Sequence, residues 1–265
     1  TVVGVMRWRF SGTYRNGTRS PYPGAMMRWH HIAGLLFAVI TFTWIFSGLM
    51  SMNPWRIFDS GAAPLRMEAM HGGSLLLPEQ PASVQALLAA APASVRELRW
   101  TRTAGHTLVQ ATAPGVRTAL LDAAAAQVHT WDKGALEAAV ARLLPAPVER
   151  IDTLQAYDTY YYTRDAHTMG GGADKPLPVL RVVFADAQAS WVHVDPHTGT
   201  VLGRIDSHRR LSRWLFGMLH SWDWLPLITL RPLWDIAMIV LSLGGVAMSL
   251  TGVVIGWRRV GLKLR

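Results

Sequence analysis

Histidines beside apolar runs carry the clearest chemical potential in this sequence. His30 and His31 begin one long apolar run, whereas His208 and His220 precede a second one. Two imidazoles that face each other at one depth of a membrane can hold a b-type haem between them. If both runs cross a bilayer, the two pairs lie on opposite sides of it, so no pair within this chain can hold one haem.

His30 and His220 are therefore candidate haem ligands only if another helix or subunit supplies the remaining ligands. His31 is a weaker candidate, because it points about 100° away from His30 around a helix. The alternative is that His30 and His220 form interfacial hydrogen bonds beside Trp29 and Trp222.

Two further groups of residues have the types and spacing of metal ligands. Thioethers with an imidazole can bind Cu(I), although methionines near a membrane surface more often serve packing. The residues of this group are Met50, Met52, Met67, Met70 and His71. The second group is His193, Asp195 and His197, but its two histidines lie on either side of a predicted turn, Asp195–Gly199, which favours a structural role.

The sequence contains none of the other common catalytic patterns. It has no cysteine, which excludes thiolate metal sites, iron–sulfur ligation and disulfides within the chain. It also lacks the Ser–His–Asp, HExxH, P-loop and GxGxxG arrangements. We therefore predict no catalytic residue, and no flavin or nicotinamide site that would supply electrons.

The elements that position the histidines are two apolar runs without any charged side chain, residues 29–55 and 236–257. Each reaches the roughly 20 residues that a helix needs to cross a bilayer. We expect one membrane helix over residues 27–52, ended by Asn53-Pro54, and a second over 232–258. In the second helix a small-residue face is expected to pack against the first helix or a partner helix rather than lipid; its residues are Gly244, Gly245, Ser249, Gly252 and Gly256.

The distribution of charge predicts the topology. The net charge is +9, and the two tails that flank the apolar runs contain nine basic residues and no acidic one. The segment between the tails is therefore neutral, which excludes a nucleic-acid-binding stripe on it. By the positive-inside rule the arm 1–26 and the tail 259–265 are cytoplasmic, and residues 53–206 form a periplasmic domain at a bacterial inner membrane. Because the first residue is Thr rather than Met, further helices upstream are an open expectation.

The domain between the helices contains an internal repeat. Pro92–Leu98 aligns with Pro145–Ile151, and each follows a helical pattern and precedes alternating, β-branched segments. We therefore predict an α+β membrane protein in which a helix followed by an antiparallel sheet occurs twice. A loop with Gly170–Gly172 at its tip is expected in the second copy. Residues 207–231 are expected to form an amphipathic helix at the membrane surface, ended by Pro226.

Several of these stretches resemble PepSY-domain proteins with associated transmembrane helices. The stretches are Arg28–Gly34, Phe46–Trp55, Leu177–Phe184, Trp191–Leu202, Gly217–Asp223 and Arg231–Asp235. The resemblance implies that the two repeats are PepSY-like. Some relatives are inner-membrane haem proteins that reduce ferric siderophores, with histidines at the positions of His30 and His220; others inhibit peptidases or serve as binding modules. This chain departs from the reductases in having only two clear spans.

The function expected first is that of a non-catalytic accessory or binding subunit of a larger membrane assembly for redox chemistry or iron uptake. Its expected partners are membrane lipid and other integral membrane subunits. The alternatives are a b-haem electron-transfer protein that reduces ferric chelates on the periplasmic side, and a periplasmic module that regulates peptidases.

Overall fold

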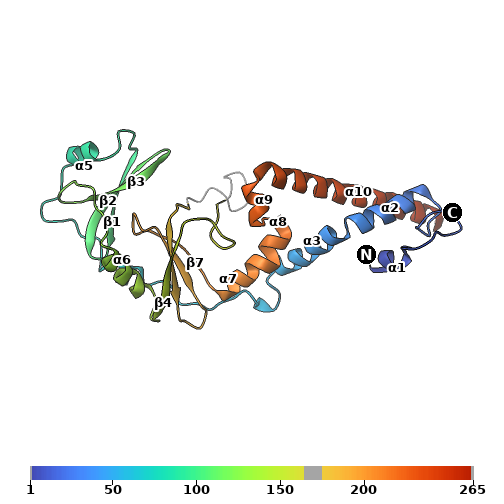
Figure 1. The fold of residues 1–265 in the computed structure, drawn as a ribbon, viewed down its shortest axis with the longest axis horizontal. Coiled ribbons are helices and arrows are strands. Elements are labelled where there is room, and N and C mark those ends of the chain that lie inside the picture. Colours follow the sequence, from blue (N-terminus) through green and yellow to red (C-terminus); the bar gives the residue numbers. More distant parts are fainter. Residues whose placement is uncertain (1, 164–174, 264–265) are drawn as a thin grey trace. The chain divides into compact units, whose positions relative to one another are not determined.

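The computed structural model describes residues 2–163 and 175–263 and divides the chain into two compact units (Figure 1). One unit comprises Thr1–Ile57 and Leu211–Arg265, and the other comprises Phe58–Arg210. We call them the helical unit and the sheet unit. The sheet unit combines helices with antiparallel sheets, so the predicted α+β fold class is present. The loop predicted around Gly170–Gly172 lies outside the described residues.

The first half of the sheet unit is a helix followed by a meander. Helix α5 (Val84–Ala90) begins at Ser83, whose Oγ accepts a hydrogen bond from the Ala86 N–H at 3.2 Å. The strands β1 (Glu97–Thr103), β2 (His106–Ala113) and β3 (Val116–Asp122) then pair antiparallel in that order. Leu87 of α5 is fully buried with Val109, Ala111 and Leu121 of the strands.

The second half repeats this order. Helix α6 (Lys133–Val140) is capped by Asp132 and continues into η2 (Ala141–Leu143). It is followed by β4 (Val148–Leu154), β5 (Val179–Phe184), β6 (Trp191–Val194) and β7 (Val201–Ile205), which pair antiparallel in chain order. The short helix α4 (Met67–His71) adds Met70 to the same hydrophobic core.

Strand β4 begins inside the aligned segment Pro145–Ile151, where the sequence does not predict a strand. A bulge between Val148 and Arg150 shifts the register with β5, so that Val148 and Ile151 both face the core although they are three residues apart. The bulge breaks the two-residue alternation by which a strand is recognised.

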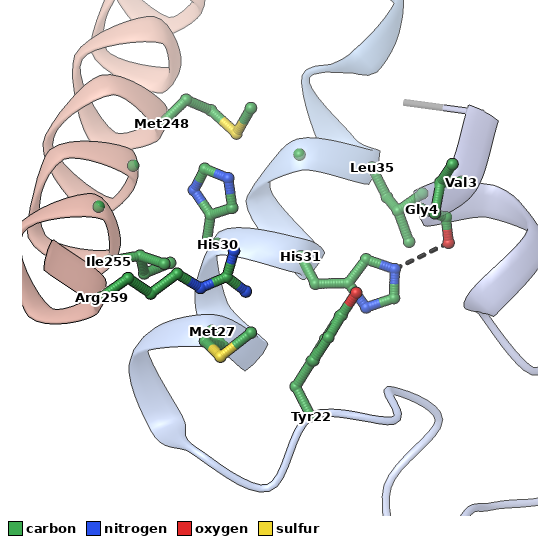
Figure 2. Close-up of a pocket in the computed structure, with 13 residues that line it drawn as sticks. Val3, Gly4, Tyr22, Met27, His30, His31, Leu35, Met248, Ile255 and Arg259 are labelled. Carbon is green, nitrogen blue, oxygen red and sulfur yellow. Dashed lines mark hydrogen bonds between the residues drawn. The ribbon is translucent and has the colours of Figure 1, made fainter. Parts of the chain in front are cut away.

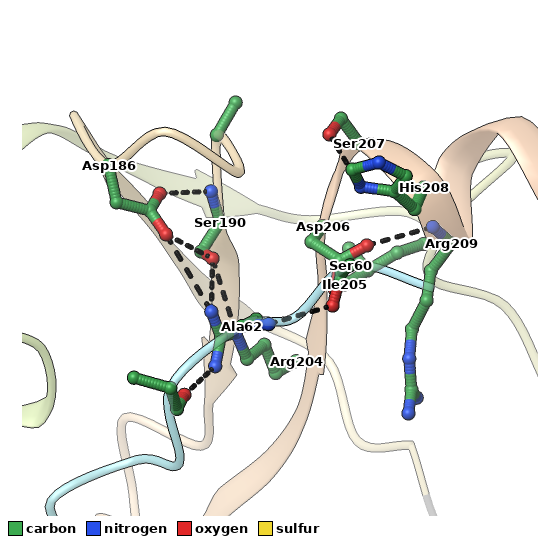
Figure 3. Close-up of polar contacts among 12 residues, drawn as sticks. Ser60, Ala62, Asp186, Ser190, Arg204, Ile205, Asp206, Ser207, His208 and Arg209 are labelled. Carbon is green, nitrogen blue, oxygen red and sulfur yellow. Dashed lines mark hydrogen bonds and ion pairs between the residues drawn. The ribbon is translucent and has the colours of Figure 1, made fainter. Parts of the chain in front are cut away.

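A polar network joins the segment around Ala63, which leads into the sheet unit, to this second sheet (Figure 3). Arg204 of β7 donates from Nη2 to the Ser190 hydroxyl at 2.7 Å, lies 3.6 Å from the Asp186 carboxylate, and donates from Nη1 to the Ala63 carbonyl. Asp206 accepts from the Arg209 N–H at 2.8 Å and so caps helix α7 (Ser207–Ser212).

The helical unit begins with α1 (Val2–Arg7), α2 (Ala25–Leu36), α3 (Ala38–Ser51) and η1 (Pro54–Arg56). The expected single helix over 27–52 is in fact two helices that meet at Phe37 with a bend of 66°. Neither proline nor glycine stands at position 37, so the sequence lacks the usual signal of a kink there. The bend occurs where the Phe37 ring contacts Gly244 of the second apolar run.

The segment expected as one surface helix is also interrupted. After α7 the backbone is π-helical in η3 (Arg213–Met218) and α-helical in α8 (Leu219–Ser221). The helix then ends at Trp222, whose φ of 48° is left-handed, and not at Pro226. Pro226 instead lies in the first turn of α9 (Leu225–Thr229), where a missing N–H costs nothing.

Helix α10 (Arg231–Lys263) completes the helical unit and is long and apolar enough, over Pro232–Gly261, to cross a membrane. The bent pair α2 and α3 would be a second span if it is counted as one element. One face of α10 is uncovered, and its large apolar side chains are exposed: Ile236, Ile239, Val240, Leu243, Val246, Leu250 and Val253.

Replacing Gly199 with Ala is expected to lower the free energy of unfolding by about 2 kcal/mol. Gly199 has a φ of +70°, and a Cβ there would lie 2.9 Å from Thr103 Cγ2 and 3.2 Å from the Trp131 ring. The measurement is the thermal unfolding midpoint of the full chain in mild detergent. Gly203→Ala is the matched control, since a Cβ at Gly203 would meet nothing within 4 Å. Equal shifts for both variants would contradict this packing of the turn.

Candidate functional site

The predicted small-residue face of α10 lies against α2 and α3 in an antiparallel arrangement. A Cβ at Gly244 would come within 2.3 Å of the Phe37 ring, one at Gly245 within 3.7 Å of Trp44, and one at Gly252 within 3.6 Å of His30. Glycine therefore permits the close approach of the helices. Ser249 lines a groove on the same side, whereas a Cβ at Gly256 would meet nothing within 4 Å.

Near the ends of α2 and α10 this packing leaves a cavity of about 470 Å³ (Figure 2). The size is that of a small-molecule site. Its walls come from α1, α2 and α10 and from the arm between α1 and α2. Side chains with polar or soft atoms contribute to the lining: Tyr22, Met27, His30, His31, Met248 and Arg259.

His30 lines the cavity with one ring nitrogen already in use. Its Nδ1 is 2.7 Å from the Thr251 hydroxyl of α10, and no described residue bonds to its Nε2. Met248 lines the same cavity as His30 (Figure 2). A hydrogen bond to one nitrogen fixes the orientation of an imidazole and leaves the other nitrogen for a ligand.

His31 has a structural role. It is buried, its Nδ1 is 2.8 Å from the Ser20 hydroxyl, and its Nε2 is 2.8 Å from the Gly4 carbonyl. The rings of Trp8 and Tyr22 pack edge-on against it. His31 therefore fixes the N-terminal arm to α2, and both of its nitrogens are occupied.

His220 belongs to a separate part of the helical unit. Its Nδ1 is 3.1 Å from the hydroxyl of Ser47 in α3, and its backbone carbonyl accepts from Trp44 Nε1 at 3.0 Å. The turn that follows is fixed by an ion pair in which Arg213 Nη1 lies 2.6 Å from the carboxylate of Asp223, which is only 1% exposed.

In the helical unit, hydrogen bonds orient the side chains of the two expected haem ligands, His30 and His220, but no second imidazole faces either of them. His30 contacts α10 and His220 contacts α3, at sites that share no residue. Among the described residues, no second histidine with an open ring nitrogen lines the His30 cavity. Haem binding at either position would therefore need a ligand from outside the described residues.

The candidate copper ligands are divided between the two units. Met50 and Met52 belong to the helical unit, whereas Met67, Met70 and His71 belong to the sheet unit. Met70 is fully buried in the core of the second sheet, and Met67 packs against that core. These are packing positions for both side chains.

The histidines of the His193–His197 segment have separate hydrogen-bond partners. His197 Nε2 is 3.0 Å from the Thr118 carbonyl, and Asp195 accepts from the His197 N–H at 2.9 Å. His193 is buried and accepts at Nε2 from Arg181 Nε at 3.0 Å. Among the described residues, no group of three or more His, Asp or Glu side chains could hold a metal ion.

Arg181 and His193 belong to a buried charge network on one face of the second sheet. Arg181 Nη1 is 2.7 Å from Asp158 Oδ2, and the Arg181 guanidinium stacks 4.6 Å from the Trp191 ring. Burial, together with the charge of Arg181, lowers the pKa of His193 to about 4. Burial would raise the pKa of Asp158, but hydrogen bonds from Arg181 and from the Tyr161 and Tyr160 N–H groups outweigh it and lower that pKa.

No protein-family model, curated protein or solved structure matches this chain. The resemblance to PepSY-domain proteins therefore stays a prediction from the sequence.

The residues that complete the cavity were not predicted from the sequence. Met248 and Arg259 meet His30 only because α10 runs antiparallel to α2, and Tyr22 approaches only through the fold of the arm. A usable signal was present, since Met248, Gly252, Ile255 and Arg259 recur at three- and four-residue spacing on one face of α10.

Because the pKa of His193 is lowered, the stability of the protein is expected to depend on pH. In the unfolded chain His193 binds a proton below its ordinary pKa of about 6.5. In the folded chain it binds that proton only below about pH 4. The free energy of unfolding should therefore fall by about 3 kcal/mol between pH 6.5 and pH 4. Denaturant unfolding at several pH values measures this slope.

The variant His193→Gln keeps an acceptor for Arg181 and removes the titration, so most of this slope should disappear. His208→Gln is the control and should retain the slope. An unchanged slope in His193→Gln would show that another group carries the pH dependence.

Proposed function

We propose that this chain is a non-catalytic, membrane-anchored subunit of a larger inner-membrane assembly, and that its sheet unit is a periplasmic binding domain. The observation that carries the proposal is the uncovered apolar face of α10. Burial of apolar surface contributes about 25 cal/mol per Å², so a face of this size is unfavourable in water. Lipid and a partner helix are the surroundings that fit it.

The charges of the helical unit support an orientation with the basic end in the cytoplasm and the sheet unit in the periplasm. Because α2 and α10 are antiparallel, the basic arm and the basic end of α10 lie at the same end of the unit. Among the described residues of this unit the carboxylates are Asp223 and Asp235, both in the segment that precedes or begins α10. The positive-inside rule then favours a cytoplasmic location for the basic end.

The buried network of the second sheet lacks the features of an acid–base catalytic site. Arg181, His193 and Asp158 are engaged with one another, and His193 is neutral at pH 7. A general acid or base needs a pKa near the working pH and access to a substrate. This network offers neither. Its role is to hold the sheet and the segment that contains Asp158 together.

A second candidate function is that of a haem-bearing reductase. The observation that favours it is that His30 and His220 each bond a hydroxyl through Nδ1 while no described residue bonds Nε2. His30 and His220 would each hold a haem iron, which would supply one-electron transfer across the membrane. This function requires ligands or electron donors outside the described chain.

The absence of cysteine allows a direct test of the topology with single-cysteine variants. We expect a membrane-impermeant maleimide to label Leu76→Cys in intact spheroplasts, since Leu76 is 65% exposed in the sheet unit. Phe10→Cys, at a residue that is 73% exposed in the arm, should be labelled only after permeabilisation. Equal labelling of both variants in intact spheroplasts would contradict the proposed orientation.

The accessory role is tested by the uncovered face of α10. A photo-cross-linking residue in place of Leu243 is expected to capture another membrane polypeptide in native membranes. Cross-links to lipid alone, together with a monodisperse monomer after extraction in mild detergent, would contradict membership of a larger assembly.

A further inference from the structure

We infer that the cavity between α1, α2 and α10, together with the neighbouring groove between α3 and α10, binds one anionic phospholipid. The inference rests on the proposed membrane placement of the helical unit. It concerns the cavity of Figure 2, where the phosphate would lie at the Arg259 end and one acyl chain would extend along α10.

The Arg259 end of the cavity has the chemistry of a phosphate site. Arg259 forms no hydrogen bond or ion pair with any described residue, and Figure 2 shows its side chain extending toward His30 and Met27. Tyr22, whose hydroxyl accepts from Arg7 Nη1 at 2.9 Å, lines the same cavity. A guanidinium with a tyrosine hydroxyl and an imidazole supplies the donors that phosphate oxygens accept.

The charges around the cavity favour an anionic headgroup over a zwitterionic one. Neither residues 1–57 nor residues 236–265 contain an aspartate or a glutamate. A choline or ethanolamine headgroup would bring an ammonium group into this basic surrounding with no carboxylate to pair it. Basic pockets between membrane helices on the cytoplasmic side are suited to anionic lipid headgroups.

A second, mostly apolar hollow lies farther along α10 and shares one lining residue with the cavity. Met248 lines both the cavity and a second hollow of about 560 Å³ between α3 and α10. The second hollow is bordered by Trp44, Ile45 and Val246 and is left open by Gly245 and Ser249. An acyl chain fits such a groove, whereas a soluble phosphate ester has no group to fill it.

The test is native mass spectrometry of the full chain with phosphatidylglycerol or phosphatidylcholine added in mild detergent. We expect one phosphatidylglycerol to remain bound and phosphatidylcholine to dissociate. Arg259→Gln should weaken phosphatidylglycerol about fivefold, as expected for one basic residue at a lipid headgroup. Arg258→Gln is the matched control, since Arg258 is a neighbouring, exposed arginine that does not line the cavity. Equal losses in both variants would show non-specific attraction to a basic tail and overturn the inference.

A second pair of variants tests the cavity itself. Gly256→Leu adds a side chain where nothing lies within 4 Å, so it should fill the cavity and abolish the bound lipid without disturbing the fold. Gly261→Leu makes the same change outside the cavity and should leave binding intact. Unchanged binding in Gly256→Leu, or displacement of the lipid by millimolar glycerol phosphate, would overturn the site.

Maleimide labelling of Leu76→Cys and Phe10→Cys reports the membrane placement separately. If the two cysteine variants are labelled as expected but no phosphatidylglycerol is retained, the lipid-binding inference is refuted and the proposed membrane placement still stands.

Discussion

The close contact between α10 and the bent pair α2 and α3 is the constraint on which the helical unit depends. At Gly244 even a single methyl group would overlap the Phe37 ring. Because the backbones approach so closely, His30 reaches the Thr251 hydroxyl and Met248 lies over Gly34. The same contact encloses the cavity at the basic end and leaves the opposite face of α10 uncovered. Packing with small residues, rather than apolar burial, is the way in which helices associate in lipid.

The sheet unit is organised by a different interaction, the buried pairing of Arg181 with Asp158 and His193. The buried guanidinium contacts a carboxylate at Nη1, an imidazole at Nε and the Trp191 ring over its face, whereas its Nη2 has no hydrogen-bond partner among the described residues. The two histidines with the spacing of metal ligands have separate protein partners: His193 is the acceptor for Arg181, and His197 lies within reach of the Thr118 carbonyl. The network is thus part of the architecture of the sheet.

The sequence was sufficient for those features that depend on local pattern. Charge-free runs and small-residue spacing predicted α10 and its contact face, and the two aligned proline segments predicted the repeated helix and sheet. The features it missed depend on tertiary contacts. The helix bends at Phe37 without a proline, and a bulge in β4 breaks the alternation that would predict a strand. Helix α8 ends at Trp222 with a left-handed backbone, which is usual for glycine or asparagine. The cavity residues Met248 and Arg259 belong to the same class, since only the antiparallel packing brings them to His30.

The central claim is that this chain is a non-catalytic membrane subunit, and the most direct test is a reduced-minus-oxidised visible spectrum. The protein should be extracted gently from its native membrane with its partners still attached. The account predicts no b-type haem signal that depends on His30 or His220, so any signal from a partner should persist in His30→Ala and His220→Ala. A b-type signal that is lost in either variant would contradict the account and would establish this chain as a haem-binding electron-transfer protein.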